Sequence, residues 1–197
     1  MQIGAGKAGV FAAALVSMAL AFMAQVSEAA IVADVELPDS VTVGGEELVL
    51  NGAGLRTKFG FKVYAGALYL PARAYTSGSA VRMDGPKRIT MHFIYKNSPG
   101  GKLVKGWREG FRNNLTIEEQ DALHSRIDRF CDLFGDTSRG ETYTFDYIPG
   151  LGTQVYQNGR IRTTIEGDDF MRALMLIWLG KEPAQESLKR AMLGGGD

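Results

Sequence analysis

Arg56 is the residue of this sequence whose chemistry is easiest to specify. It lies in the stretch from Asn51 to Pro71, where a Gly-rich segment leads into a long apolar run that contains tyrosine. A guanidinium stays charged and donates a planar fork of hydrogen bonds, which suits a carboxylate or a developing enolate or phenolate oxygen. The alternative is a turn arginine that faces water or forms a structural ion pair. The sequence thus offers one candidate anion-binding group beside apolar surface.

Other residue types that could carry chemistry form no recognisable site. His92 and His124 are the only histidines and stand far apart, without a cysteine or carboxylate at metal-ligand spacing. The chain has no nucleophile elbow, phosphate loop or dinucleotide fingerprint. The single cysteine, Cys131, cannot form an internal disulfide and falls in a helical pattern, which is typical of a small buried residue. We therefore expect no metal and no cofactor.

The element expected to position Arg56 is the strand that follows it. From Phe59 onward the residues alternate with the period of a strand, and neither parity is polar. Such a strand is covered on both faces, or packs on the core with one face and lines a cavity for an oily ligand with the other. Arg56 itself is expected in the Gly-rich turn. Tyr64 lies in the strand, where tyrosine is favoured and often finds a partner for its hydroxyl.

Further strands are expected on both sides of a helical middle segment. Short strands are expected within residues 35–50, followed by the long strand and then by a polar turn from Ser77 to Pro86. The remaining strands are expected at Lys87 to Lys96, Glu141 to Tyr147, Thr153 to Gln157 and Arg160 to Glu166. Asn158-Gly159 between the last two is a strong hairpin signal, so the last three strands should form an antiparallel meander.

Four helices are expected in two pairs. The first helix should start at Ser98-Pro99 with the serine as cap, and the second at Thr116, which forms a capping-box pattern with Glu119. Gly135 should end this pair. In the second pair, Asp168 or Asp169 should cap a helix that runs to Leu179, and a last helix should span Ala184 to Leu193. This order of elements predicts an α+β domain with helices packed on one face of an antiparallel sheet.

Two separated motifs resemble the chalcone isomerase superfamily. The first is G-x-G-x-R, a short turn and then K-V-Y-A-G-x-L-Y-L, within Asn51 to Pro71; the second is the helix and turn Ile177-Trp178-Leu179-Gly180-Lys181-Glu182-Pro183. The resemblance runs from about Asp34 to Gly194 and is closest to bacterial exported chalcone isomerase-like proteins. It implies an open-faced β-sandwich with a cleft between sheet and helices.

The resemblance also implies roles for Arg56 and Tyr64. In plant chalcone isomerases the matching arginine is the main catalytic group and stabilises an oxyanion during an intramolecular ring closure. The catalytic enzymes usually carry threonine where this chain has Tyr64. The fatty-acid-binding branch has a tyrosine there, which grips a carboxylate together with the arginine. Arg56 and Tyr64 look like that pair.

Four weaker positions follow from the same resemblance. The catalytic enzymes have a helix motif of tyrosine, lysine and asparagine that orders water around the substrate, and its best register here gives Lys102, Lys105 and Glu109. Only the lysine, Lys105, is retained. The same residues also fit a plain exposed helix face. Near the C-terminus, Ile177 takes the place of a polar residue that helps in the plant enzymes.

The first 29 residues are expected to be a signal peptide. Lys7 precedes an apolar run from Ala8 to Ala24, and Ser27-Glu28-Ala29 offers small residues at a cleavage site. The run is short for a bilayer span, which needs about 20 apolar residues. We expect an exported, periplasmic protein with a single domain at residues 30–197. Once the signal peptide is cleaved, the protein should not be an integral membrane protein. The lesser alternative is that the signal peptide is retained as a membrane anchor.

Three functions remain from these observations. The first is binding of a small amphipathic or aromatic ligand, such as a fatty acid whose carboxylate meets Arg56 and Tyr64 at the end of an apolar cavity, without chalcone isomerase activity. The second is an isomerase of the chalcone isomerase type (an intramolecular lyase) that uses Arg56. The third is a cell-envelope interaction protein with no small ligand. Basic and acidic residues both count 22, so nothing favours nucleic acid.

Overall fold

Arg56 lies within a strand and not in a turn. In the computed structural model, which describes residues 29–195, strand β4 (Glu46–Lys58) contains Arg56 and pairs with β5 (Phe61–Leu70) in one long antiparallel hairpin. The turn falls at Phe59 and Gly60, whose φ values are 50° and 80°. The prediction of a Gly-rich turn before Phe59 is therefore wrong. The glycines that suggested this turn lie in β4 and have a packing role there.

Those glycines allow a helix to approach the sheet closely. Helix α5 (Glu186–Met192) crosses β4, and a Cβ atom added to Gly52 would lie 2.1 Å from the carbonyl oxygen of Ala191. At Gly54 it would lie 2.6 Å from the Cβ of Ala191. Glycine inside a strand often marks such a close approach.

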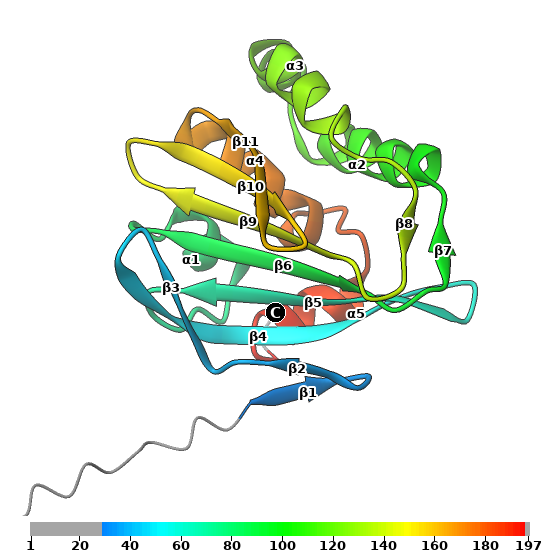
Figure 1. The fold of residues 1–197 in the computed structure, drawn as a ribbon. Coiled ribbons are helices and arrows are strands. Elements are labelled where there is room, and N and C mark those ends of the chain that lie inside the picture. Colours follow the sequence, from blue (N-terminus) through cyan, green and yellow to red (C-terminus); the bar gives the residue numbers. More distant parts are fainter. Residues whose placement is uncertain (1–28, 196–197) are drawn as a thin grey trace, which may run out of the picture.

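The sheet is one continuous antiparallel meander (Figure 1). Its order in the described residues is β11-β10-β9-β6-β5-β4-β3, with every neighbouring pair antiparallel. The remaining strands of the sheet are β3 (Ser40–Val43), β6 (Lys87–Phe93), β9 (Thr142–Ile148), β10 (Gly152–Gln157) and β11 (Arg160–Ile165). The predicted final meander is confirmed, and Asn158-Gly159 forms its last turn with φ values of 51° and 74°.

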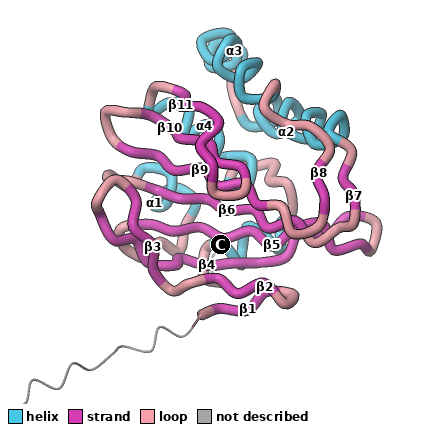
Figure 2. The backbone as a smooth tube through the Cα atoms, viewed as in Figure 1, coloured by secondary structure: helices cyan, strands magenta, loops and turns pink. Residues whose placement is uncertain are grey.

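The helices lie on one face of this sheet (Figure 2). They are α1 (Ser77–Arg82), α2 (Gly100–Asn114), α3 (Ile117–Cys131), α4 (Asp168–Leu179) and α5. Helices α2 and α3 are inserted between β6 and β9, and the short pair β7 (Asn97–Ser98) and β8 (Thr137–Ser138) closes the base of the insertion.

Aromatic side chains form the core between sheet and helices. The ring of Trp107 on α2 lies 5.2 Å from Phe130 on α3, 5.8 Å from Phe145 on β9 and 5.5 Å from Trp178 on α4, measured between ring centroids. All four side chains are buried. The apolar stripes of three helices therefore meet one sheet face at a single aromatic cluster.

The other face of the sheet is covered over β4 and β5 by an N-terminal hairpin. Strands β1 (Ala30–Val32) and β2 (Val35–Leu37) pair with each other and pack on a second, smaller apolar cluster that includes Leu50, Ala67 and Tyr69. Strand β5 is thus buried on both faces from Tyr64 to Leu70, which is the first of the two arrangements that its sequence predicted.

Helix starts were only partly predictable. The capping box of Thr116 and Glu119 is confirmed. Ser98, however, lies in β7 and does not cap α2. At the start of α2 the backbone N–H of Gly100 instead donates to Oδ1 of Asp136, a residue far along the chain, at 2.8 Å. Helix α4 begins after Gly167, so neither Asp168 nor Asp169 is its cap. The predicted polar turn at Ser77 to Pro86 contains α1, which Thr76 caps.

The predicted signal peptide falls almost entirely outside the described residues. Among residues 29–195, no helix combines the length and apolar character that crossing a bilayer requires.

Replacing Gly52 by alanine should strongly destabilise the protein. The new methyl group would overlap backbone atoms of α5, which cannot move aside as a flexible side chain can. Overpacking of this kind costs about 3 kcal/mol when the neighbour is rigid. The measurement is the urea midpoint of unfolding at unchanged m-value.

The matched control is Gly106→Ala on α2, where an added Cβ meets nothing within 4 Å. Alanine there should raise the unfolding free energy by about 0.5–1 kcal/mol, because it restricts the unfolded chain and favours helix. Equal stability of Gly52→Ala and the wild type would show that α5 is not held at the distance described.

Candidate functional site

Arg56 and Tyr64 face each other across the β4–β5 hairpin. The two residues are directly paired in the strand register, and the register shifts immediately after Arg56. Directly opposed side chains point to the same face of a sheet, with Cβ atoms about 5 Å apart. That face carries the helices, because Tyr64 belongs to the core cluster that includes Trp178 and Leu188. The hairpin therefore brings together the two residues that the sequence singled out.

The guanidinium of Arg56 is held by neutral groups. One of its terminal nitrogens, Nη1, donates to the side-chain oxygen Oε1 of Gln185 at 3.0 Å and to the carbonyl oxygen of Thr57. Gln185 immediately precedes α5, and its Oε1 also accepts the backbone N–H of Thr57 at 2.8 Å. The amide of Gln185 thus fixes both the start of α5 and the position of Arg56.

No acidic partner neutralises Arg56 within residues 29–195. The side chain is half-buried, none of the ion pairs of the described chain includes it, and its Nε and Nη2 donors make no hydrogen bond there. The other half-buried arginines among residues 29–195 are paired, Arg88 with Asp146 and Arg126 with Asp169. Arg56 therefore has the charge and the free donors to bind an anion.

Tyr64 is buried, with 6% of its surface exposed. Its hydroxyl oxygen accepts a hydrogen bond from the indole Nε1–H of Trp178 at 2.9 Å, and no described residue accepts the hydroxyl proton. Burial raises the pKa of Tyr64 to about 12, while the Trp178 hydrogen bond and the charge of Arg56 act in the opposite direction. Tyr64 is thus a neutral hydrogen-bond donor at any physiological pH.

The four weaker positions do not join this pair. Lys102 and Lys105 are exposed on α2, and Lys105 Nζ lies 3.8 Å from Glu109 Oε1 in an ion pair along the helix. Ile177 is buried on α4, where it packs against Gly110 of α2. No hydrogen bond or ion pair in the described chain links these residues to Arg56 or Tyr64, although Ile177 and Tyr64 belong to the same core cluster, and their roles remain predictions.

Sequence reasoning missed Gln185 and the polar role of Trp178. Gln185 is an ordinary polar residue before a helix, and nothing in the sequence indicates a bond to a residue as distant as Arg56. Trp178 stands in the second motif of the sequence without an assigned role, and it is buried. A buried indole needs a partner for its N–H, and that requirement was the available signal.

The space around Tyr64 is filled by side chains. The rings of Tyr64 and Phe93 have centroids 5.8 Å apart, and Trp178 and Leu188 complete the surroundings. The expected apolar cavity ending at Arg56 is not among the two pockets described for residues 29–195, neither of which is lined by Arg56 or Tyr64.

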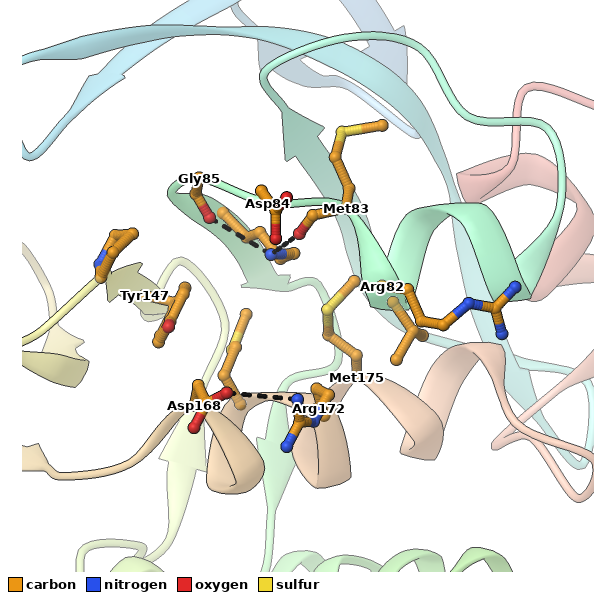
Figure 3. A pocket seen from close by; sticks show the side chains of 12 residues that line it. Arg82, Met83, Asp84, Gly85, Tyr147, Asp168, Arg172 and Met175 are labelled. Carbon is orange, nitrogen blue, oxygen red and sulfur yellow. Dashed lines mark hydrogen bonds and ion pairs between the residues drawn. The ribbon is translucent and has the colours of Figure 1, made fainter.

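The larger pocket lies at the opposite end of β6 (Figure 3). It has a volume of about 470 Å³ and is lined by α1, α4 and the start of β6. Lys87 is buried there; its Nζ donates to the carbonyl oxygens of Met83 and Gly85 and lies 5.2 Å from the ring centroid of Tyr147. Burial lowers the pKa of Lys87. Arg172 is paired with Asp168 at 3.2 Å. These cations already have partners.

The smaller pocket, of about 210 Å³, lies between α3 and α4. Among the described residues, no three His, Cys, Asp or Glu side chains are grouped as a metal site would require. The pair of Arg56 and Tyr64 is therefore the candidate site.

The comparisons with known proteins agree with this fold. The family model for chalcone isomerase-like proteins matches residues 29–194, so the chain belongs to the chalcone isomerase-like family. A similar solved structure is that of a fatty-acid binding protein from Arabidopsis thaliana, with a TM-score of 0.61 and 15% sequence identity over 81% of this chain and 92% of the other. No curated protein sequence matches the chain. The predicted family and the α+β open-faced fold are confirmed.

Replacing Tyr64 by phenylalanine should destabilise the folded protein by about 1–3 kcal/mol, because the buried N–H of Trp178 would lose the one acceptor it has among the described residues. Tyr75→Phe is the matched control, since Tyr75 is exposed and makes no described hydrogen bond. It should change the unfolding free energy by less than about 0.5 kcal/mol. A Tyr64→Phe protein as stable as the control would contradict the described hydrogen bond.

The same tyrosine should make stability sensitive to alkali. A pKa raised from 10.0 to about 12 means that the folded state keeps its proton longer than the unfolded state. Stability from Tyr64 is therefore complete below pH 10.0 and is lost as the pH rises towards 12. The free energy of unfolding, measured with urea at increasing pH, should decline less steeply in Tyr64→Phe than in the wild type. In Tyr75→Phe it should decline as it does in the wild type.

Proposed function

We propose that this protein binds a small amphipathic carboxylate, such as a fatty acid, with the carboxylate held by Arg56 and Tyr64. The observation that carries the proposal is the half-buried guanidinium of Arg56, which has no acidic partner in the described chain. Partly buried cations are usually paired, because removing a charge from water is costly without compensation. A ligand anion would supply the missing partner.

The available donors suit a carboxylate. Arg56 has Nε and Nη2 free, which can donate in parallel to two oxygens, and the Tyr64 hydroxyl has its proton free. Because Trp178 already donates to the Tyr64 oxygen, that hydroxyl is polarised towards donating its own proton to an anion. Charge-assisted bonds of this kind are roughly twice as strong as neutral ones.

The surroundings suit an apolar tail. Phe93, Trp178 and Leu188 lie next to Tyr64 in the buried cluster. Since these side chains fill the space, a ligand must move some of them, and the start of α5 is best placed to move while its end stays packed on Gly52. The helix is short, and the Gln185 amide that ties its start to β4 bonds to the same guanidinium that would receive the ligand. An incoming carboxylate would compete with that amide.

The similarity to the fatty-acid binding protein from Arabidopsis supports this ligand class, although at 15% identity it is the fold that is shared. We further propose that binding occurs without turnover, as Lys105, the one retained position of the catalytic helix motif, is 75% exposed and paired with Glu109. Export of the protein, on the basis of residues 1–29, is part of the same proposal.

The test is ligand extraction and titration with the purified protein. Small molecules that copurify are identified by mass spectrometry without prior delipidation, and dodecanoate is then titrated while tryptophan fluorescence is recorded. Because Trp178 bonds to Tyr64, a carboxylate at this site should change the emission. The variant Arg56→Gln should bind at least about 10-fold more weakly, as expected for the loss of a charge-assisted pair.

The matched control is Arg129→Gln, which removes an exposed arginine that also donates to a carbonyl oxygen, that of Thr164 at 2.9 Å. It should bind like the wild type. Equal affinity of the wild type and Arg56→Gln, or a wild type that neither retains nor binds a fatty acid, would refute the proposal. In that event cyclisation of a chalcone is the next activity to assay.

A further inference from the structure

Exposed aromatic side chains gather at one end of the β4–β5 hairpin. Phe59 is 89% exposed, Phe61 58% and Tyr95 37%, and the rings of Phe61 and Tyr95 are in edge contact with centroids 5.6 Å apart. The segment after β6 is joined to this end of β5, because the carbonyl oxygen of Val63 accepts the backbone N–H groups of Ile94 and Tyr95. We call Phe59, Phe61 and Tyr95 the aromatic tip. Figure 1 shows the β4–β5 turn projecting at the right edge of the fold.

Phe59 is poorly suited to its place in the turn. Phe59 and Gly60 form a two-residue connection in which both residues have positive φ, and such turns favour Asn-Gly. The described chain has three other two-residue turns with positive φ at both residues, at Ala33-Asp34, Gly44-Gly45 and Asn158-Gly159. The last of them has the preferred residue pair, with φ values of 51° and 74°. At Phe59 a bulky ring occupies the same conformation and gains no burial in return. Folding therefore gives no reason for phenylalanine at this position.

The aromatic tip is surrounded by unpaired lysines. Lys58, Lys62 and Lys96 are exposed, and none of them forms an ion pair within residues 29–195. The ammonium of Lys58 lies 5.9 Å from the ring centroid of Phe59. No acidic residue occurs in the segments 54–63 and 94–99 that build this end. A chain of zero net charge thus concentrates positive charge around its exposed rings.

This combination matches the interface of a bilayer that contains anionic lipids. Aromatic rings are favoured at the level of the lipid headgroups, and lysines beside them are attracted to anionic headgroups. A protein partner is a poorer match, because stable protein interfaces bury about 800 Å² per partner over a broad surface. Here the apolar groups project from a single narrow turn. Insertion into a fluid interface needs no complementary shape.

We propose that the aromatic tip, with Lys58, Lys62 and Lys96, docks this protein on membrane surfaces that contain anionic lipids. Phe59 and Phe61 insert among the lipid headgroups while the lysines remain at the headgroup level. Arg56 lies on the same hairpin, just before the turn, so docking would place the candidate site close to the bilayer. The proposal rests on the exposed side chains alone and does not depend on the ligand of Arg56.

A tryptophan placed in the tip reports insertion directly. In Phe59→Trp, vesicles of phosphatidylcholine and phosphatidylglycerol should shift the emission of the new tryptophan to shorter wavelength, and brominated lipid should quench it. The native Trp107 and Trp178 are buried and serve as background, which is subtracted with the wild type. Because the reporter is local, any membrane affinity of residues 1–29 does not mimic the result.

The matched reporter is Leu151→Trp, in the exposed turn between β9 and β10 at the other end of the sheet. It should show neither the shift nor the quenching. In the Phe59→Trp protein, the combined changes Lys58→Gln, Lys62→Gln and Lys96→Gln should weaken partitioning by at least about 10-fold, and pure phosphatidylcholine or high salt should have a similar effect. Arg56→Gln in this background should still insert.

Stability gives a second and independent check. Phe59→Asn installs the preferred Asn-Gly turn, so its melting temperature should equal or exceed that of the wild type. A clearly lower value would mean that Phe59 serves folding and would overturn the proposal. Equal quenching at positions 59 and 151, or no response to anionic vesicles, would also overturn it. So would a wild type that is a dimer in solution and becomes monomeric in Phe59→Asn, because the tip would then be a contact between two copies of the chain.

Discussion

The close contact between β4 and α5 is the constraint on which the candidate site depends. Only a residue without a side chain leaves room for the backbone of Ala191 above Gly52. That contact brings the start of α5 to Arg56, where the amide of Gln185 bonds to the guanidinium, and places Leu188 beside Tyr64. The geometry around Arg56 therefore results from backbone packing two turns of helix away. The same glycines that resemble a turn in the sequence are what make this packing possible.

The site combines two environments across one pair of strands. Arg56 lies at the half-exposed edge of the helix-covered face, and Tyr64 lies inside the core with its hydroxyl bonded to Trp178. A cation alone would bind any anion from solution, and a buried hydroxyl alone would only satisfy a hydrogen bond within the core. Their opposition across the hairpin provides a charged contact that leads directly to apolar surface. This arrangement favours molecules with a charged end and an apolar body over simple anions.

Local signals in the sequence predicted local structure well. The capping box at Thr116, the Asn158-Gly159 turn and the alternation of β5 each depend on residues within a few positions of one another, and the structure confirms them. Contacts between distant residues were not predictable. Asp136 replaces Ser98 at the start of α2, and Gln185 contacts Arg56 across most of the chain. The strand around Arg56 was misread because glycine serves both turns and close helix contacts, and the sequence does not distinguish the two uses.

The insertion of α2 and α3 between neighbouring strands has a consequence for how the chain reaches this fold. Most strand pairs in the meander join segments adjacent in sequence and can form as local hairpins, whereas β6 and β9 must find each other across the whole helical insertion. Closing a long flexible loop costs more entropy than closing a short one. Early formation of α2 and α3, with β7 and β8 paired at their base as in the folded protein, would shorten the effective loop before β6 meets β9. The aromatic cluster centred on Trp107 joins the insertion to both α4 and β9. Its contacts would stabilise the pairing of β6 with β9, so that sheet closure and core formation become one cooperative step.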